Sequence, residues 1–212
     1  MKKKEGIRHI IFDLGGVLYE VDYHRTIQAF EKLGASDFAA YFEQAGQNEW
    51  FDLLETGKMS AKEFVRKLSG LLKNASETAI TDAWNAMLLG MMHDKLTYLE
   101  SLKSKYNIFL LSNINPIHEA FIREELGDKF PYFENLFEKM YFSHVLGKRK
   151  PHPETFQHVL EENGLEASET LFIDDSIQHT EGAAKAGLQV HHLLPKENLI
   201  EVLDAIREMK QD

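Results

Sequence analysis

Short apolar runs alternate with longer stretches of helical spacing along most of this chain. The runs occupy residues 7–12, 108–111, 140–143 and 171–173, and a last strand is expected over residues 188–193. Apolar runs of this length, bounded by polar residues or glycine, are typical of strands buried in a sheet. Because helical stretches separate them, the pattern predicts an α/β fold in which right-handed crossovers join parallel strands. We therefore expect a doubly wound parallel sheet.

Apolar residues spaced by three or four positions predict the helices that connect these strands. They are expected around residues 96–102, 117–121, 156–160, 181–186 and 199–206. All but the last lie between two strands, as a crossover connection requires.

Residues from about 22 to 89 break the alternation, because they show helical spacing and little strand signal. Residues 60–63 read Ser-Ala-Lys-Glu, a capping box that predicts the start of a helix. Trp84, Met87 and Leu88 are assigned to a further helix of the same region. The pattern therefore predicts a helical insert between the first strand and the rest of the sheet.

Polar residues follow three of the predicted strands at the point where each strand ends. Asp13 follows the first strand, Ser112-Asn113 the second, and Asp174-Asp175 the run at 171–173. Because the carboxyl ends of parallel strands share one edge of a sheet, these side chains are expected to face one crevice. Lys150 lies in a loop ahead of a helix and is expected to face the same crevice.

Composition narrows the classes of function. The 212 residues contain no cysteine, which excludes disulfides and thiolate metal sites. A formal charge of −10 disfavours binding a nucleic acid through the whole surface. We find no apolar stretch of membrane-spanning length and no signal-peptide pattern at the start. We expect a cytoplasmic protein, a monomer or a homodimer, with no membrane or nucleic-acid partner.

Several carboxylates at one sheet edge need a counter-charge. Mg²⁺ prefers oxygen ligands and is commonly held by one or two carboxylates together with a substrate phosphate. Aspartate is also a known covalent nucleophile that forms an aspartyl-phosphate. The arrangement therefore points to Asp13 as a nucleophile, with Mg²⁺ and Lys150 screening its repulsion from a phosphate.

Four segments in order resemble the motifs of the haloacid dehalogenase-like hydrolase superfamily. They are residues 13–17 (DLGGV), 112–113 (SN), 150–151 (KP) and 174–175 (DD). Within the superfamily the chain most resembles bacterial α-D-glucose-1-phosphate phosphatases and the phosphatase domain of epoxide hydrolases. The resemblance implies a hydrolase core at residues 1–18 and 93–212 and a helical cap at residues 19–92.

The resemblance also implies a role for each motif residue. Asp13 would be the nucleophile and a metal ligand, and Gly15 would offer its backbone carbonyl to the metal. Asp175 would bind the Mg²⁺ directly, and Asp174 directly or through water. The residues implied to bind the phosphate of a small phosphorylated metabolite are Ser112, Asn113 and Lys150.

The sequence departs from the family pattern at two positions. Many family phosphatases have an acid/base aspartate where this chain has Gly15, and a further aspartate where it has His179. A general acid is typically worth about 10²–10⁴ in rate. Its absence favours substrates with a good leaving group, such as a sugar 1-phosphate, unless His24 of the insert or bound water supplies the proton.

Three alternatives follow from the same residues. The fold could serve a haloacid dehalogenase-type cleavage of carbon–halogen bonds, although that reaction would leave the aspartate pair without a use. Loss of the acid at Gly15 could instead leave a catalytically weak phosphate-binding or regulatory protein. In the insert, aromatic residues either line a sugar-binding face or pack in its own core: Tyr19, Tyr23, Phe42, Trp50 and Trp84.

Overall fold

The structure, a computed structural model, describes residues 6–45, 49–72 and 74–208. A five-stranded sheet forms its centre, with the strand order β5-β4-β1-β6-β7 and every neighbouring pair parallel. Its strands are β1 (His9–Phe12), β4 (Asn107–Ser112), β5 (Lys139–Phe142), β6 (Thr170–Asp174) and β7 (Gln189–His192). The predicted α/β fold with a parallel sheet is confirmed.

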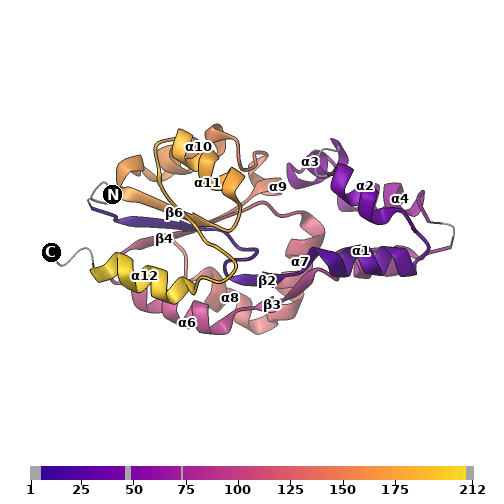
Figure 1. The fold of residues 1–212 in the computed structure, drawn as a ribbon, viewed down its shortest axis with the longest axis horizontal. Coiled ribbons are helices and arrows are strands. Elements are labelled where there is room, and N and C mark those ends of the chain that lie inside the picture. Colours follow the sequence, from indigo (N-terminus) through magenta and orange to yellow (C-terminus); the bar gives the residue numbers. More distant parts are fainter. Residues whose placement is uncertain (1–5, 46–48, 73, 209–212) are drawn as a thin grey trace.

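Helices cover both faces of this sheet (Figure 1). One face carries α6 (His93–Leu102), α7 (Pro116–Leu126), α8 (Phe130–Glu134) and α12 (Leu199–Glu208). The other face carries α10 (Pro153–Asn163) and α11 (Ile177–Lys185). The shorter elements around the sheet are η1 (Gly127–Lys129), α9 (Ser143–Leu146) and η2 (Ala167–Glu169).

The side chains of each strand alternate between the two faces of the sheet, and this explains why helices pack on both faces. Ile10 and Phe12 of β1 belong to the core under α6 and α12, whereas Ile11 packs with Phe156 and Phe172 in the core under α10 and α11. Successive strand residues point to opposite faces, so a continuous apolar run is needed where both faces are buried.

The strand register brings the two predicted aspartates side by side. Phe12 of β1 pairs with Ile173 of β6, so that Asp13 and Asp174 are the next residues along the two strands. The backbone N–H of Asp13 donates to the carbonyl of Ile173 at 2.9 Å. The sheet itself therefore fixes the backbone from which both carboxylates project.

A second group of helices, here called the helical lobe, lies beyond one end of the sheet (Figure 1). It consists of α1 (Tyr23–Lys32), α2 (Phe38–Ala45), α3 (Glu49–Glu55), α4 (Ala61–Ser69) and α5 (Glu77–Asn85). The lobe has its own apolar core, in which Phe64 packs against Trp84 with ring centroids 4.8 Å apart. The capping box at Ser60 and Glu63 is present at the start of α4.

A two-stranded antiparallel sheet lies at the base of the lobe. It pairs β2 (Tyr19–Val21) with β3 (Leu88–Met91). The assignment of Met87 and Leu88 to a helix is wrong, because α5 ends at Asn85 and the chain then becomes extended. Gly90, at φ +140°, has a conformation that no helix contains. Three- and four-residue strands are too short to show a period in the sequence.

The lobe contacts the core at two separated places. On one side the indole of Trp84 stacks on the imidazole of His118 in α7, with ring centroids 5.3 Å apart. On the other side Arg149, in the loop before Lys150, forms ion pairs with Asp52 and Glu55 of α3. These contacts hold the lobe above the edge of the sheet that carries Asp13.

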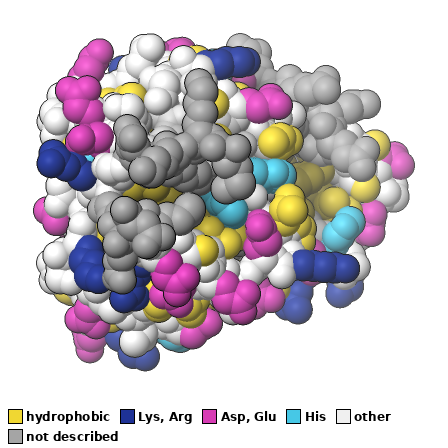
Figure 2. Space-filling view, turned by 60° about the vertical axis from the view of Figure 1, so that its left-hand side comes forward, with side chains coloured by type: hydrophobic (Ala, Val, Ile, Leu, Met, Phe, Trp, Pro, Cys, Tyr) yellow, Lys and Arg dark blue, Asp and Glu magenta, His cyan; other side chains and the backbone are white. Residues whose placement is uncertain are grey.

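The surface mixes charges on the face seen in Figure 2, where acidic and basic side chains are interspersed among the residues described. The expectation that nucleic acid is not a partner stays a prediction, as do the cytoplasmic location and the oligomeric state. In the described part of the chain, each helix is too short or too polar to cross a bilayer.

Helix α11 packs so closely on the loop of Lys150 that a side chain at Gly182 would not fit. A Cβ there would lie 2.0 Å from the carbonyl oxygen of Pro151. Alanine is normally better than glycine inside a helix by about 1 kcal/mol. We expect the opposite sign here: Gly182→Ala should lower the free energy of unfolding by about 1–3 kcal/mol, because the helix must move.

Urea unfolding of the variant checks this expectation. Gln178→Ala, at an exposed position of the same helix, is the matched control and should change stability by less than about 0.5 kcal/mol. A Gly182→Ala variant as stable as the wild type would contradict the close packing.

Candidate active site

A buried lysine joins the two aspartates at the sheet edge. The ammonium nitrogen of Lys150 lies 2.7 Å from Oδ1 of Asp13 and 2.7 Å from Oδ2 of Asp174. The Lys150 side chain is completely buried, and so is that of Asp174. An ammonium group has three hydrogens to donate, and these two contacts use two of them.

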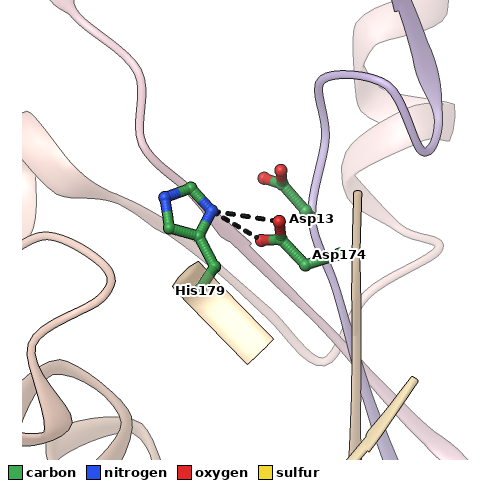
Figure 3. A group of neighbouring side chains, drawn as sticks. All are labelled: Asp13, Asp174 and His179. Carbon is green, nitrogen blue, oxygen red and sulfur yellow. Dashed lines mark hydrogen bonds and ion pairs between the residues drawn. The ribbon is translucent and has the colours of Figure 1, made fainter. Parts of the chain in front are cut away.

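Asp174 is held by further donors from the start of α11. The backbone N–H of Ser176 donates to its Oδ1 at 2.8 Å. Nδ1 of His179 lies 3.0 and 3.1 Å from the two carboxylate oxygens, as Figure 3 shows. A carboxylate only accepts, so the proton of the imidazole is on Nδ1. His179, which replaces the family aspartate, therefore orients Asp174.

The two carboxyl groups are electrostatically different. Burial tends to raise the pKa of Asp174, but Lys150 and His179 outweigh it and hold that pKa well below its usual range. Burial and the negative charge of Asp174 raise the pKa of Asp13, against the opposing effect of Lys150. Burial also lowers the pKa of His179, which is consistent with a neutral imidazole. The shared ammonium group therefore favours the ionised form of Asp174 more than that of Asp13.

The loop that carries Lys150 is fixed by hydrogen bonds to its backbone. The side-chain amide of Asn113 accepts from the N–H of Lys150 and donates to its carbonyl, each at 2.9 Å. The hydroxyl of Thr155 donates to the carbonyl of Arg149 at 2.7 Å. Asn113, expected to bind phosphate, thus has a positioning contact that the sequence did not indicate.

The turn after Asp13 allows the second aspartate of the pair to come close. Gly16 has φ +70°, and a Cβ at this residue would lie 2.1 Å from Oδ2 of Asp175. Glycine is needed here both for the backbone conformation and for the approach of the carboxylate. Burial and the charge of Asp174 raise the pKa of Asp175.

An open cavity of about 430 Å³ begins at Asp13. The expected site residues that line it are Asp13, Gly15, Ser112, Asn113 and Asp175. Lys150 and Asp174 lie behind Asp13 through the ion pairs given above. The structure therefore brings together all seven residues that the sequence singled out.

The helical lobe supplies the opposite wall. Tyr23, Phe42, Phe51 and Glu55 line the open cavity, and they also line a smaller, mostly apolar chamber of about 130 Å³ beside it. Trp84 also lines this chamber. Trp50 instead lies beneath the ammonium group of Lys67, 4.3 Å from the ring centroid. Some of the aromatic residues of the insert thus face the site, whereas others pack within the lobe.

Two site residues were missed by sequence reasoning. Glu55 lies at the end of α3, a seven-residue helix whose spacing is too short to indicate a buried face. Arg149 precedes Lys150 in a loop where a charged side chain usually faces solvent, but it lines the open cavity and pairs with Glu55. His24, the proton donor considered from the sequence, is exposed on α1 and lines neither cavity.

Removing the buried ammonium should strongly destabilise the protein. In Lys150→Met the carboxylates of Asp13 and Asp174 would lose their shared partner, and breaking such a buried pair costs about 3–5 kcal/mol. Urea unfolding measures this loss, and Lys148→Met in the same loop is the control, expected below about 1 kcal/mol. Adding Asp174→Asn to Lys150→Met should restore part of the lost free energy of unfolding, because one unpaired carboxylate is removed. If Lys150→Met were as stable as the wild type, the buried ion pairs of Lys150 with Asp13 and Asp174 would be contradicted.

Comparison with known proteins places this geometry in a family. Residues 7–187 match the family model described as haloacid dehalogenase-like hydrolase. A D-ribitol-5-phosphate phosphatase of Bacteroides thetaiotaomicron is 34% identical over 171 residues, which cover 80% of this chain and 83% of the relative. A sesquiterpene phosphatase of Aspergillus oryzae is 28% identical over 86% of this chain and 88% of its own length.

Solved structures agree with the sequence comparison. A haloacid dehalogenase-like enzyme of Bacteroides thetaiotaomicron, in complex with magnesium and inorganic phosphate, superimposes with a TM-score of 0.84 and is 33% identical. The match covers 93% of this chain and 99% of that one. The protein belongs to the haloacid dehalogenase-like hydrolase family.

Proposed function

We propose that this protein is a Mg²⁺-dependent phosphatase that hydrolyses a small phosphorylated metabolite through an aspartyl-phosphate on Asp13. The observation that carries the proposal is the position of Asp13, which faces an open cavity while Lys150 holds it from behind. Two related proteins with named activities, a D-ribitol-5-phosphate phosphatase and a sesquiterpene phosphatase, support the reaction class.

The proposed reaction starts with an attack of the free carboxylate oxygen of Asp13 on phosphorus. Lys150 binds Oδ1, which fixes the orientation of the carboxylate and favours its ionised form. The second carboxylate oxygen is then directed toward the phosphate. A new Asp13–phosphorus bond forms as the bond to the leaving oxygen breaks, and water then cleaves the aspartyl-phosphate at phosphorus.

The donor set at this sheet edge fits a divalent cation. Asp13, Asp174 and Asp175 face a single compensating ammonium group, Lys150, so negative charge exceeds positive charge. Mg²⁺ would supply the missing positive charge between carboxylate and phosphate. We propose Asp13, Asp175 and the carbonyl of Gly15 as its ligands.

Asp174 is a less suitable direct ligand than its position suggests. Ligand atoms of Asp13, Asp174 and His179 lie within 4.8 Å of one another, which is a spacing that could hold a metal. However, both oxygens of Asp174 already contact Lys150, Ser176 or His179. Asp174 is therefore proposed to act on the metal through water.

The phosphate would lie between the ends of β4 and the loop of Lys150. Ser112 lines the cavity, and the third hydrogen of the buried Lys150 ammonium would bind a phosphate oxygen placed beside Asp13. Asn113 completes this set with its second amide hydrogen, while its other contacts hold Lys150 in place. These donors match the oxygens of a phosphoryl group.

The helical lobe is proposed to be a cap domain spanning residues 19–92 over a core of residues 1–18 and 93–212. Its helices contact the core at α7 and at Arg149, and its side chains form the far wall of the cavity. A cap in this position excludes water from the phosphate and selects the leaving group.

We propose that the leaving group belongs to a sugar or sugar alcohol. Aromatic rings such as Phe42, Phe51 and Trp84 suit the C–H faces of a polyol, and Glu55 can bind a hydroxyl group. A sugar 1-phosphate, favoured by the absence of an acid at Gly15, is one member of this class. The related D-ribitol-5-phosphate phosphatase supports the class as a whole.

Phosphate release from a panel of metabolites tests the function. We expect release from a sugar 1-phosphate or a pentitol phosphate that requires Mg²⁺ and falls by more than about 10³-fold in Asp13→Asn, which removes the nucleophile. Thermal unfolding of the variant serves as the control for folding. Halide release from a 2-haloacid without Mg²⁺, or binding of phosphate without any turnover, would contradict the proposal.

A further inference from the structure

Glu55 is a carboxyl group to which the proposed reaction steps above assign no proton transfer. It ends helix α3 of the lobe and lines both the open cavity at Asp13 and the apolar chamber beside it. Its side chain is 23% exposed, and Oε2 is buried. It therefore lies where the phosphate cavity meets the space for the leaving group.

The charges around Glu55 are not balanced. Its Oε2 lies 3.0 Å from Nη2 of Arg149, but among the residues described it accepts no aligned hydrogen bond. The same guanidinium group also pairs with Asp52. One positive charge is shared by two carboxyl groups, so at most one of the two negative charges is fully compensated.

We infer that Glu55 donates the proton to the leaving oxygen and then takes a proton from the water that attacks the aspartyl-phosphate. This inference rests on the proposed phosphatase function and assigns to the lobe the acid/base group that Gly15 cannot supply. Glu55 lines the same open cavity as Asp13 and also the apolar chamber in which the leaving group is proposed to lie.

The environment of Glu55 suits such a role. Burial raises its pKa to about 7, while the nearby Lys150 ammonium opposes this rise. An acid/base group works best when its pKa is near the working pH, because both protonation states are then accessible. The other charged or titratable groups that face Glu55 are Tyr23, Asp13, Asp174, Asp175, His118, His179, Arg149 and Asp52. A phosphate dianion would add negative charge and favour the protonated form further.

The steps balance. A carboxylate oxygen of Asp13 bonds to phosphorus, the bond between phosphorus and the leaving oxygen breaks, and that oxygen takes the proton of Glu55. The ionised Glu55 then removes a proton from water, whose oxygen bonds to phosphorus as the bond to Asp13 breaks. Glu55 ends protonated, Asp13 ends free, and the products are the alcohol and inorganic phosphate.

Other titratable groups near the cavities are less suitable. Burial raises the pKa of Tyr23, with further contributions from Asp13 and Asp175, so its hydroxyl is a poor donor. Burial lowers the pKa of His118 to about 4, and its two ring nitrogens contact Trp84 and Asn115. His179 uses Nδ1 to hold Asp174. Glu55 is left as the group with both the position and the pKa.

Two substrates of different leaving-group basicity separate a proton donor from a structural residue. 4-Nitrophenyl phosphate releases a stable phenolate that needs no proton, whereas a pentitol 5-phosphate releases a basic alkoxide. For Glu55→Gln, kcat/KM for the pentitol phosphate should fall by about 10²–10⁴-fold. For 4-nitrophenyl phosphate it should change by less than about threefold, because kcat/KM reports the step before water attacks.

Asp52→Asn is the matched control. Asp52 pairs with the same Arg149, but its side chain is 63% exposed and lines neither of the two cavities. This variant should therefore leave kcat/KM for both substrates within about threefold of wild type. The role of Glu55 would be overturned if kcat/KM fell equally in the two variants, or if Glu55→Gln lowered kcat/KM equally for both substrates. Neither result would affect the phosphatase function.

The pH profile provides a second readout. Glu55 must be protonated to act as the donor, so kcat/KM for the pentitol phosphate should fall as pH rises through its pKa of about 7. This alkaline limb should be missing in Glu55→Gln and retained in Asp52→Asn, at a somewhat lower pH because Arg149 then pairs with Glu55 alone. If the alkaline limb persists in Glu55→Gln, the role of Glu55 is overturned. If the wild-type protein shows no Mg²⁺-dependent turnover, the phosphatase function and the role of Glu55 are overturned together.

Discussion

The buried ion pairs of Lys150 are the interaction on which the rest of the site depends. A fully buried ammonium group is stable only when negative groups and hydrogen bonds compensate it, and Asp13 and Asp174 provide both. Three elements must therefore meet: the ends of β1 and β6 and the loop before α10. The close contact of Gly182 with Pro151 and the two hydrogen bonds between the Asn113 amide and the Lys150 backbone hold that loop in place.

The parallel sheet and the helical lobe have different roles in the proposed site. The parallel sheet fixes the proposed nucleophile, because neighbouring strands in register leave little freedom to Asp13 and Asp174. The helical lobe supplies the groups that would meet the leaving group, and it is joined to the core by a few contacts at Trp84 and Arg149. Proteins that share the core can then carry out the same reaction on different leaving groups if the residues of the lobe differ.

Much of the site could be predicted from the sequence because it lies at strand ends. Asp13, Ser112 and Asp174 each follow a buried apolar run, and parallel strands bring such positions to one edge. Asn113 shows the limit of this reasoning, because a residue type does not reveal that its amide holds the backbone of Lys150. Glu55 could not be found in this way, since its place depends on how a short helix of the lobe packs over the core.

The central claim is that Asp13 becomes covalently phosphorylated, and trapping that intermediate tests it most directly. Wild-type protein would be mixed with Mg²⁺ and 4-nitrophenyl phosphate, quenched in acid within the first turnover, and digested for mass spectrometry. The account predicts a phosphoryl adduct on the peptide that contains Asp13, at the aspartate itself. Phosphate release at the same rate with unmodified Asp13, or an adduct on another residue, would contradict it.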